Sequence, residues 1–197
     1  MAPTFVGLTG GISAGKSEAL AAFERAGAAT LASDEVVHDL LRGNQLRARL
    51  IDRWGEGIAP DGEVDRARVA EIVFERPEEL DWLEAELHPL VAERFAAWRA
   101  GLPEGTELAV VEVPLLFETG MESAFDAVVC VVADDGVRQD RVRGRELTGL
   151  EGRHGRQLSQ EEKAARATHV IANDGTLAEL EARIDELVEE LIGSTDR

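Results

Sequence analysis

A glycine-rich segment near the N-terminus has the composition and spacing of a phosphate-binding loop. The segment from Gly10 to Ser17 reads GGISAGKS and fits the pattern G-x-x-x-x-G-K-[ST]. Its glycines allow backbone N–H groups to approach phosphate oxygens, and a helix that begins there directs its positive end at the same anion. Lys16 is expected to reach the β- and γ-phosphates, and the Ser17 hydroxyl is expected to bind Mg²⁺.

This loop predicts binding of a nucleoside triphosphate such as ATP. It lies between an apolar segment typical of a buried strand and a segment typical of a helix, which is the context that the motif requires. The alternative is a glycine-rich turn with a chance lysine, and the agreement of both flanks disfavours it. The expected ATP-binding residues are Gly11, Ile12, Ser13, Ala14, Gly15, Lys16, Ser17 and Glu18.

Two acidic residues lie where predicted strands end, and ligands gather at the carboxyl ends of the strands in a parallel sheet. Asp34 follows the second predicted strand, and Glu112 lies near the end of the third. Asp34 could accept a proton from an acceptor hydroxyl, hold Mg²⁺, or serve only as a helix N-cap. Glu112 could organise Mg²⁺ through water, or it could be an acid at a strand end without a catalytic role.

A cluster of arginines lies in the last third of the chain. Arg138, Arg141 and Arg145 are three and four residues apart, so a helix would carry them on one face. Phosphoryl transfer requires positive charge near the transferred group, and Arg153 and Arg156 on the glycine-rich segment that follows could close over it as a lid. Some of these side chains could instead belong to a solvated helix face with ion pairs.

The hydrophobic pattern predicts strands that alternate with helices. Pro89 lies inside the longest predicted helix and is expected to kink or divide it near His88. The predicted strands cover residues 4–8, 28–31, 108–113, 127–132 and 169–172. The predicted helices cover residues 17–26, 35–41, 45–54, 66–75, 78–100, 137–147, 159–168 and 177–192.

This alternation predicts an α/β fold, in which a parallel sheet of the P-loop NTPase type is flanked by helices. We expect a single domain with a core of residues 1–34, 106–137 and 168–197. Residues 35–105 contain predicted helices and no clear strand, so we interpret them as a helical insertion that binds the second substrate. Residues 138–167 would form the arginine-bearing lid.

Composition and charge restrict the partners and the location. Twenty-one basic residues against 39 acidic ones give a formal net charge of −18, which repels nucleic acid and anionic membranes. No apolar run approaches the roughly 20 residues of a membrane span, and the first predicted strand leaves no room for a signal peptide. Cys130, the single cysteine, lies in an apolar run, is expected in the core and fits a reducing cytoplasm. We expect a cytoplasmic monomer or weak homo-oligomer that acts on small molecules.

The class of enzyme follows from what accompanies the loop. Ras-type GTPases recognise guanine through an [NT]-K-x-D element, which requires a lysine outside the loop. The only lysines of the chain are Lys16 and Lys163, and Lys163 is followed by Ala164 and Ala165. No LSGGQ-like segment follows the loop either. A small-molecule kinase with a helical acceptor region is therefore the favoured class.

The chain resembles the dephospho-coenzyme A kinase family over nearly its whole length. The opening G-L-T-G-G-I, followed by the G-K-S of the loop, matches the family pattern, and Asp34 matches the second acid of its D-x-D element. Further matches are His88-Pro89 with its H-P pair, Pro114-Leu115-Leu116-Phe117-Glu118 with its P-L-L-F-E segment, Arg141 and Arg145 with its R-x-x-x-R, Arg153 and Gln157 with its R-x-x-x-Q, and Asn173 and Gly175 with its N-x-G.

This resemblance implies transfer of the ATP γ-phosphate to the ribose 3′-hydroxyl of dephospho-coenzyme A, the last step of coenzyme A synthesis. By matched position, Asp34 would be the base, Lys16 and Ser17 the phosphate and Mg²⁺ ligands, and Arg141 the principal lid arginine. Asn173 would border the adenine of ATP. The resemblance also implies substrate-binding roles for His88, Pro114, Leu115, Leu116 and Arg145.

The chain departs from the family pattern at two places. Ser13-Ala14 stands where the family usually has Gly-Ser, so Ser13 needs a backbone conformation that a residue with a Cβ can adopt. Ala32 stands where the first acid of D-x-D is expected. Two alternatives to the family function therefore stay open. One is a related nucleoside or nucleotide kinase with another acceptor, and the other is an ATP-binding regulatory module without transfer activity.

Overall fold

The computed structural model describes residues 3–143 and 157–193. The described chain divides into two compact units. The first unit includes residues 3–32, 102–143 and 157–193, and the second includes residues 33–101. Residues 144–156, which form much of the predicted lid, lie outside the described residues.

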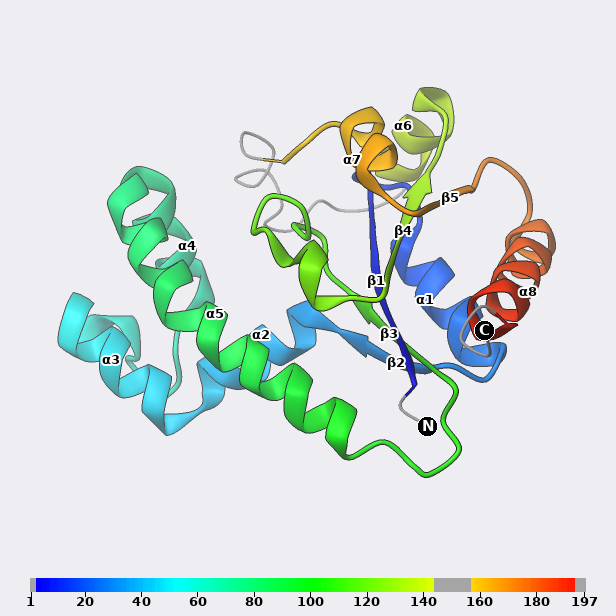
Figure 1. The fold of residues 1–197 in the computed structure, drawn as a ribbon. Helices are drawn as coiled ribbons and strands as arrows, with labels where there is room; N and C mark the ends of the chain where they lie inside the picture. Colours follow the sequence, from blue (N-terminus) through cyan, green and yellow to red (C-terminus); the bar gives the residue numbers. More distant parts are fainter. Residues whose placement is uncertain (1–2, 144–156, 194–197) are drawn as a thin grey trace. The chain divides into compact units, whose positions relative to one another are not determined.

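The first unit is built on a five-stranded sheet in the order β2-β3-β1-β4-β5, and every pairing in it is parallel (Figure 1). The expected α/β fold with a parallel sheet is therefore confirmed. The central strand β1 pairs Leu8 with Glu112 of β3 and Thr9 with Cys130 of β4. The strands are β1 (Thr4–Gly10), β2 (Ala29–Ala32), β3 (Leu108–Glu112), β4 (Ala127–Val132) and β5 (His169–Ala172).

Alternate residues of β1 pack against opposite layers, as the two-residue period of a strand requires. Val6 and Leu8 belong to a core that includes side chains of α1 (Lys16–Arg25) and α8 (Leu177–Gly193), two helices that lie side by side on one face of the sheet (Figure 1). On the other face, Phe5 stacks on Phe125 with ring centroids 4.9 Å apart. Gly7 lies under Leu116 on that face, where a Cβ would come within 2.5 Å of the leucine Cδ1.

Three further short helices of this unit are described, and they lie after β3, after β4 and before β5. The 3₁₀ turn η2 (Met121–Ala124) follows β3, and α6 (Asp135–Arg143) follows β4. Helix α7 (Gln160–Arg166) precedes β5 and begins with a capping box between Ser159 and Glu162. Hydrogen bonding from the backbone N–H of Ser159, and then from its side chain, lowers the pKa of the Glu162 carboxyl.

The second unit is helical, and its described residues contain no strand, as the sequence predicts. Asp65 caps α4 by accepting hydrogen bonds from the N–H groups of Ala67 and Arg68. The buried Glu79 carboxylate accepts both a bidentate pair of bonds from Arg53 and the indole N–H of Trp54. The helices are α2 (Ser33–Arg42), α3 (Asn44–Trp54), η1 (Glu56–Ile58), α4 (Arg66–Glu75) and α5 (Pro77–Ala100).

The long helix and one helix boundary differ from the sequence predictions. Helix α5 continues through Pro89 and is not divided there, while a kink at this residue stays a prediction. Pro89 and Ala85 are both exposed, so water can reach the carbonyl that loses its partner, while Val91 and Phe95 remain buried beyond the proline. The helix expected from residue 35 begins at Ser33, so Asp34 lies inside its first turn and is not its N-cap.

Candidate active site

The glycine-rich loop joins the end of β1 to the start of α1, as its sequence predicts. Gly15 lies immediately before α1 with φ 95° and ψ 33°, a left-handed conformation that glycine adopts readily. A Cβ at Gly15 would lie 2.1 Å from Nδ2 of Asn173, and one at Gly10 would lie 2.3 Å from the Val131 carbonyl oxygen. A side chain at either position would clash with these atoms, so glycine lets the loop lie close to its neighbours.

Ser13 accommodates its departure from the family pattern by adopting a left-handed backbone. Its φ is 58°, and among the described residues it is the only non-glycine residue with a positive φ. This conformation lies in the small left-handed region open to L-residues, and it costs roughly 1–2 kcal/mol relative to the right-handed one. The loop therefore keeps a turn at this position although its side chain is not that of glycine.

Lys16 lies over the loop that it is expected to serve. Its Nζ donates to the carbonyl oxygens of Gly11 at 3.1 Å and Gly10 at 3.5 Å. Ser17, the second residue of α1, is exposed, and its hydroxyl has no hydrogen-bond partner among the residues that the structure describes. Glu18 is exposed and Ile12 is half-buried. The contacts of these residues with phosphate and Mg²⁺ remain predictions.

Arg141 and Asn173 converge on the loop from α6 and from the end of β5. Nη1 of Arg141 donates to the carbonyl of Ala14 at 3.2 Å, and Nη2 donates to the carbonyl of Asn173 at 3.0 Å. Nδ2 of the buried Asn173 donates to the same Ala14 carbonyl at 2.9 Å. Two residues that the sequence assigns to the nucleotide site therefore contact the loop backbone, and one of them carries a positive charge.

The other described arginine of the predicted helical row has a different environment. Arg138 forms an ion pair with Asp135 of its own helix, which matches the alternative interpretation of a helix face with internal pairs. Arg145, Arg153 and Arg156 lie outside the described residues. Of the predicted row, Arg141 is thus the member that the structure brings to the loop.

A network behind the loop was missed by sequence reasoning. The Gln160 side chain accepts from Ala133 N–H at 2.9 Å and donates to the Ala133 carbonyl at 3.1 Å. Its Oε1 would lie 2.9 Å from a Cβ at Gly11, so the amide closes off space beside the loop. The glutamine occurs in an otherwise ordinary helical sequence, and no spacing signal indicates this contact.

Lys163 is the second missed residue, and it is completely buried. Its Nζ lies 3.0 Å from Oε1 of Glu118 and donates to the Pro114 carbonyl at 2.5 Å. The same Glu118 oxygen accepts from Leu158 N–H at 2.8 Å. The only signal in the sequence is the rarity of lysine in this chain, because a buried lysine needs a charged partner that cannot be identified without the fold.

The segment after β3 contains the predicted substrate residues. Pro114 and Leu115 are half-buried, and the Pro114 carbonyl also accepts from the Thr9 hydroxyl at 3.3 Å. Leu116 is fully buried against Gly7, so its side chain is part of the core in this structure. A direct substrate contact therefore remains a prediction for Pro114 and Leu115, and the packing of Leu116 favours a structural role.

Asp34 and His88 belong to the second unit, and both are exposed. Asp34 lies in the first turn of α2, whose first residue, Ser33, directly follows the last residue of β2. In the sheet, Ala32 at the end of β2 pairs with Glu112 of β3. Ala32 replaces the first acid of the D-x-D element, and Glu112 places a carboxyl group on the adjacent strand.

Cys130 has the structural role that the sequence predicts. It is buried in β4, and burial raises the pKa of its thiol to about 11, against which the charges of Lys163 and Lys16 act weakly. The thiol therefore stays protonated near neutral pH and is a poor nucleophile.

No group of three or more histidine, cysteine or acidic side chains is arranged to hold a metal ion within the described ranges. Within the same ranges, every helix is too short or too polar to cross a bilayer.

Comparisons with known proteins agree with this geometry. The family model described as dephospho-CoA kinase matches residues 4–179. The dephospho-CoA kinase of Thermobifida fusca (strain YX) is 36% identical over 191 residues, which cover 94% of this chain and 95% of the relative. The dephospho-CoA kinase of Chlamydia pneumoniae is 35% identical over 195 residues, which cover 96% of each chain.

Two solved structures share the fold. The structure of TT1252 from Thermus thermophilus has a TM-score of 0.80 and 32% identity, with 97% of this chain and 99% of that chain covered. The dephospho-CoA kinase structure from Campylobacter jejuni has a TM-score of 0.71 and 23% identity, with 97% and 98% covered. The second likeness supports the fold alone.

Proposed function

Because the chain belongs to the dephospho-coenzyme A kinase family, we propose that it transfers the γ-phosphate of ATP to the ribose 3′-hydroxyl of dephospho-coenzyme A. The products are coenzyme A and ADP. The observation that carries this proposal is the match of the family over residues 4–179, which includes the loop and every described residue that contacts it.

The loop would bind the triphosphate of ATP. Its backbone N–H groups and the start of α1 supply an anion site, and Lys16 would leave the carbonyls of Gly10 and Gly11 to bind phosphate oxygens. The exposed Ser17 hydroxyl would hold Mg²⁺, which supplies positive charge against the phosphate oxygens when it is bound. Arg141 already contacts the loop backbone, so it would add positive charge near the transferred group at little cost in ordering.

Asp34 would act as the general base. Its carboxylate takes the proton of the ribose 3′-hydroxyl as the hydroxyl oxygen forms a bond to the γ-phosphorus. The bond between that phosphorus and the β,γ-bridging oxygen breaks, and ADP leaves. Exposure of Asp34 on α2 makes its carboxylate accessible to an acceptor.

The regulatory-module alternative rests on Ala32, and the sheet register argues against it. Ala32 and Glu112 are partners on adjacent strands, which lie about 4.8 Å apart in a sheet. We propose that Glu112 supplies, through water, the carboxylate that Ala32 lacks near Mg²⁺. A chain without a first acid in its D-x-D element can then still transfer phosphate.

The expected location and assembly are proposals as well. We propose that the enzyme acts in the cytoplasm as a monomer or weak homo-oligomer. The single cysteine cannot form an internal disulfide, which fits a reducing compartment.

The test is ADP release from ATP and Mg²⁺ with a panel of acceptors. The acceptors are dephospho-coenzyme A, adenosine and AMP, with a reaction without acceptor as the background. Release with dephospho-coenzyme A alone, with coenzyme A identified as the product, supports the proposal. Release with another acceptor would assign the chain to a sister kinase, and ATP binding without release would favour the regulatory module.

A further inference from the structure

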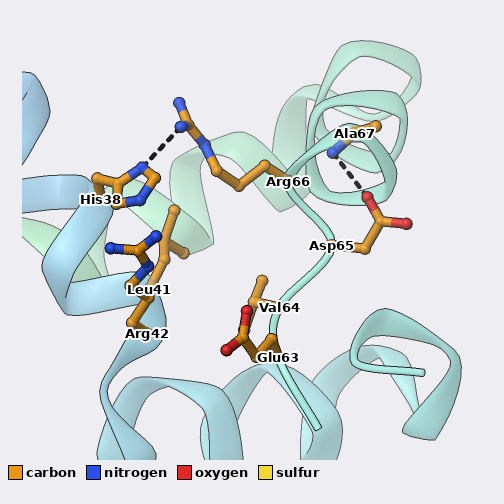
Figure 2. Close-up of a pocket in the computed structure, with 8 residues that line it drawn as sticks. All are labelled: His38, Leu41, Arg42, Glu63, Val64, Asp65, Arg66 and Ala67. Atoms are coloured by element: carbon orange, nitrogen blue, oxygen red, sulfur yellow. Dashed lines mark hydrogen bonds between the residues drawn. The ribbon is translucent and has the colours of Figure 1, made fainter. Parts of the chain in front are cut away.

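The second unit contains an open cavity of about 340 Å³, which is within the size range of small-molecule sites. One wall is the second half of α2, and the other is the segment that leads into α4 and the first turn of α4 (Figure 2). The lining residues are His38, Leu41, Arg42, Glu63, Val64, Asp65, Arg66 and Ala67.

The two arginines of this cavity lack the carboxylate partners that several arginines of the same unit have. Arg49, Arg53 and Arg76 each form an ion pair with a glutamate. Within the described part of the chain, by contrast, neither Arg42 nor Arg66 pairs with a carboxylate. Among the described residues of this unit, Arg47 and Arg94 form no ion pair either, but Arg42 and Arg66 are the two that line one cavity.

Arg66 is held toward the cavity by a histidine. Its Nη1 lies 2.8 Å from Nδ1 of His38, across the cavity from α4 to α2 (Figure 2). A guanidinium has no acceptor, so Nδ1 must be the unprotonated nitrogen and the imidazole is the acceptor. The contact therefore orients Arg66 without neutralising it, and the imidazole keeps its Nε2–H as a donor.

The two acids of the cavity do not cancel this charge. Asp65 accepts the N–H groups at the start of α4, and its other oxygen lies 3.3 Å from Nε of Arg68. Its carboxylate is thus already compensated. Glu63 is exposed on the loop that faces α2 and remains the one opposing charge among the lining residues (Figure 2). Arg42 and Arg66 together exceed it, so the cavity favours an anion.

The spacing along α2 connects this cavity to the proposed base. Asp34, His38 and Arg42 are four residues apart in succession, so they follow one face of the helix. At a rise of 1.5 Å per residue, the eight residues from Asp34 to Arg42 span about 12 Å. An acceptor whose hydroxyl lies at Asp34 would therefore extend its next ionised group along this face toward the arginines.

We propose that the cavity binds the diphosphate of the acceptor nucleotide. In dephospho-coenzyme A this diphosphate is attached to the 5′-carbon of the same ribose whose 3′-hydroxyl reacts, so the inference rests on the proposed function. Arg42 and Arg66 would each direct paired N–H groups at diphosphate oxygens, a geometry that guanidinium groups favour. No bond is made or broken in this step.

The test is calorimetric titration of the full chain with dephospho-coenzyme A in the absence of ATP. Arg42→Gln and Arg66→Gln each remove one charge and retain a helix-compatible side chain, and each should weaken binding about tenfold. Arg94→Gln is the matched control, because Arg94 is an exposed arginine of the same unit that does not line the cavity. It should bind dephospho-coenzyme A as the wild type does.

A variant with the opposite sign strengthens the test. Glu63→Gln removes the opposing carboxylate and should tighten binding of dephospho-coenzyme A several-fold. ATP affinity should be unchanged in all four variants, which also reports that they are folded. If wild-type chain binds dephospho-coenzyme A and the two cavity variants bind it equally well, the inference is overturned. Loss of ATP affinity instead of acceptor affinity would also overturn it.

Failure of the proposed function gives a different result. In that case the wild-type chain itself would neither bind dephospho-coenzyme A nor convert it to coenzyme A, and the cavity variants would not be needed to show it. The two failures are thus separated by the wild-type titration alone.

Discussion

Around the phosphate-binding loop, three of the side chains proposed to meet ATP are already hydrogen-bonded to the backbone, whereas the arginines of the second unit's cavity are exposed and have few partners. Lys16, Arg141 and Asn173 all donate to carbonyls in or beside the loop. Arg66 has one such contact, with His38, and Arg42 has none among the described residues. The nucleotide side of the enzyme is therefore organised before ligands arrive, and the acceptor side is not.

This difference has an energetic consequence. Ordering a long side chain on binding costs roughly 0.5–1.5 kcal/mol, a cost that the acceptor side would meet and the loop would largely avoid. We therefore expect acceptor affinity to depend on a small number of charged contacts. ATP affinity should depend instead on the scaffold that fixes the loop.

The largest expected effect is at Lys16. Lys16→Ala removes a half-buried ammonium whose described hydrogen bonds are to loop carbonyls, so the fold should survive. Turnover should fall about 10²–10³-fold, because charge next to the transferred phosphate is lost. Steady-state kinetics and circular dichroism on the same samples check both statements. Near wild-type turnover would show that the loop lysine is not part of the chemistry.

The scaffold behind the loop is tested at Lys163. Lys163→Met leaves the Glu118 carboxylate almost fully buried without its cation, which should lower the free energy of unfolding by about 3 kcal/mol. Urea denaturation measures the change. Lys163→Met combined with Glu118→Gln should recover most of it, since the amide oxygen can still accept from Leu158 N–H. A double variant as unstable as the single one would show that the ion pair is not the reason.

A smaller effect is expected within the loop at Ser13. Ser13→Gly removes the Cβ that makes a φ of 58° unfavourable, although glycine also gains freedom in the unfolded chain. The net result should be a stabilisation of about 0.5–1 kcal/mol, measured by thermal unfolding. A destabilised variant would mean that the serine side chain makes a contact that outweighs the backbone strain.

The helical unit provides the smallest effect, which depends on pH. Hydrogen bonds from Arg53 and then from Trp54 lower the pKa of the Glu79 carboxyl below its ordinary value of 4.5. The charged form is thus favoured in the folded state, so its contribution is present above that value and is lost as the pH falls through the lowered folded-state pKa. Glu79→Gln should flatten this part of the stability profile, as measured by unfolding at successive pH values. A profile that keeps its shape would assign the acid sensitivity to other groups.

The features of the fold that the sequence predicts correctly are those with a local sequence pattern. The loop motif indicates its own flanking strand and helix, and apolar runs indicate the five parallel strands. Gln160 and Lys163 were missed because their partners lie 27 and 49 residues away, a separation that leaves no spacing signal. The expected division at Pro89 does not occur, and the sequence does not reveal that the flanking turn faces solvent.

In the candidate site, too, some residues were predicted from the sequence and others were not. Arg141 and Asn173 were assigned by resemblance to family motifs, and the structure places both against the loop. Asp34 was assigned by its position after a predicted strand and then by resemblance. Whether it was a cap or part of the helix depended on the helix boundary, which sequence patterns locate poorly. The cavity in the second unit was not anticipated, because its arginines come from two separate helices.

The most direct test of the central claim is coenzyme A formation by Asp34→Asn, with ATP and dephospho-coenzyme A binding measured on the same protein. Asn has nearly the shape of Asp but cannot take up the hydroxyl proton. The account predicts that kcat falls about 10²–10⁴-fold while both affinities stay near their wild-type values. Wild-type kcat in Asp34→Asn would contradict the account, since the second unit would then supply no base to the reaction.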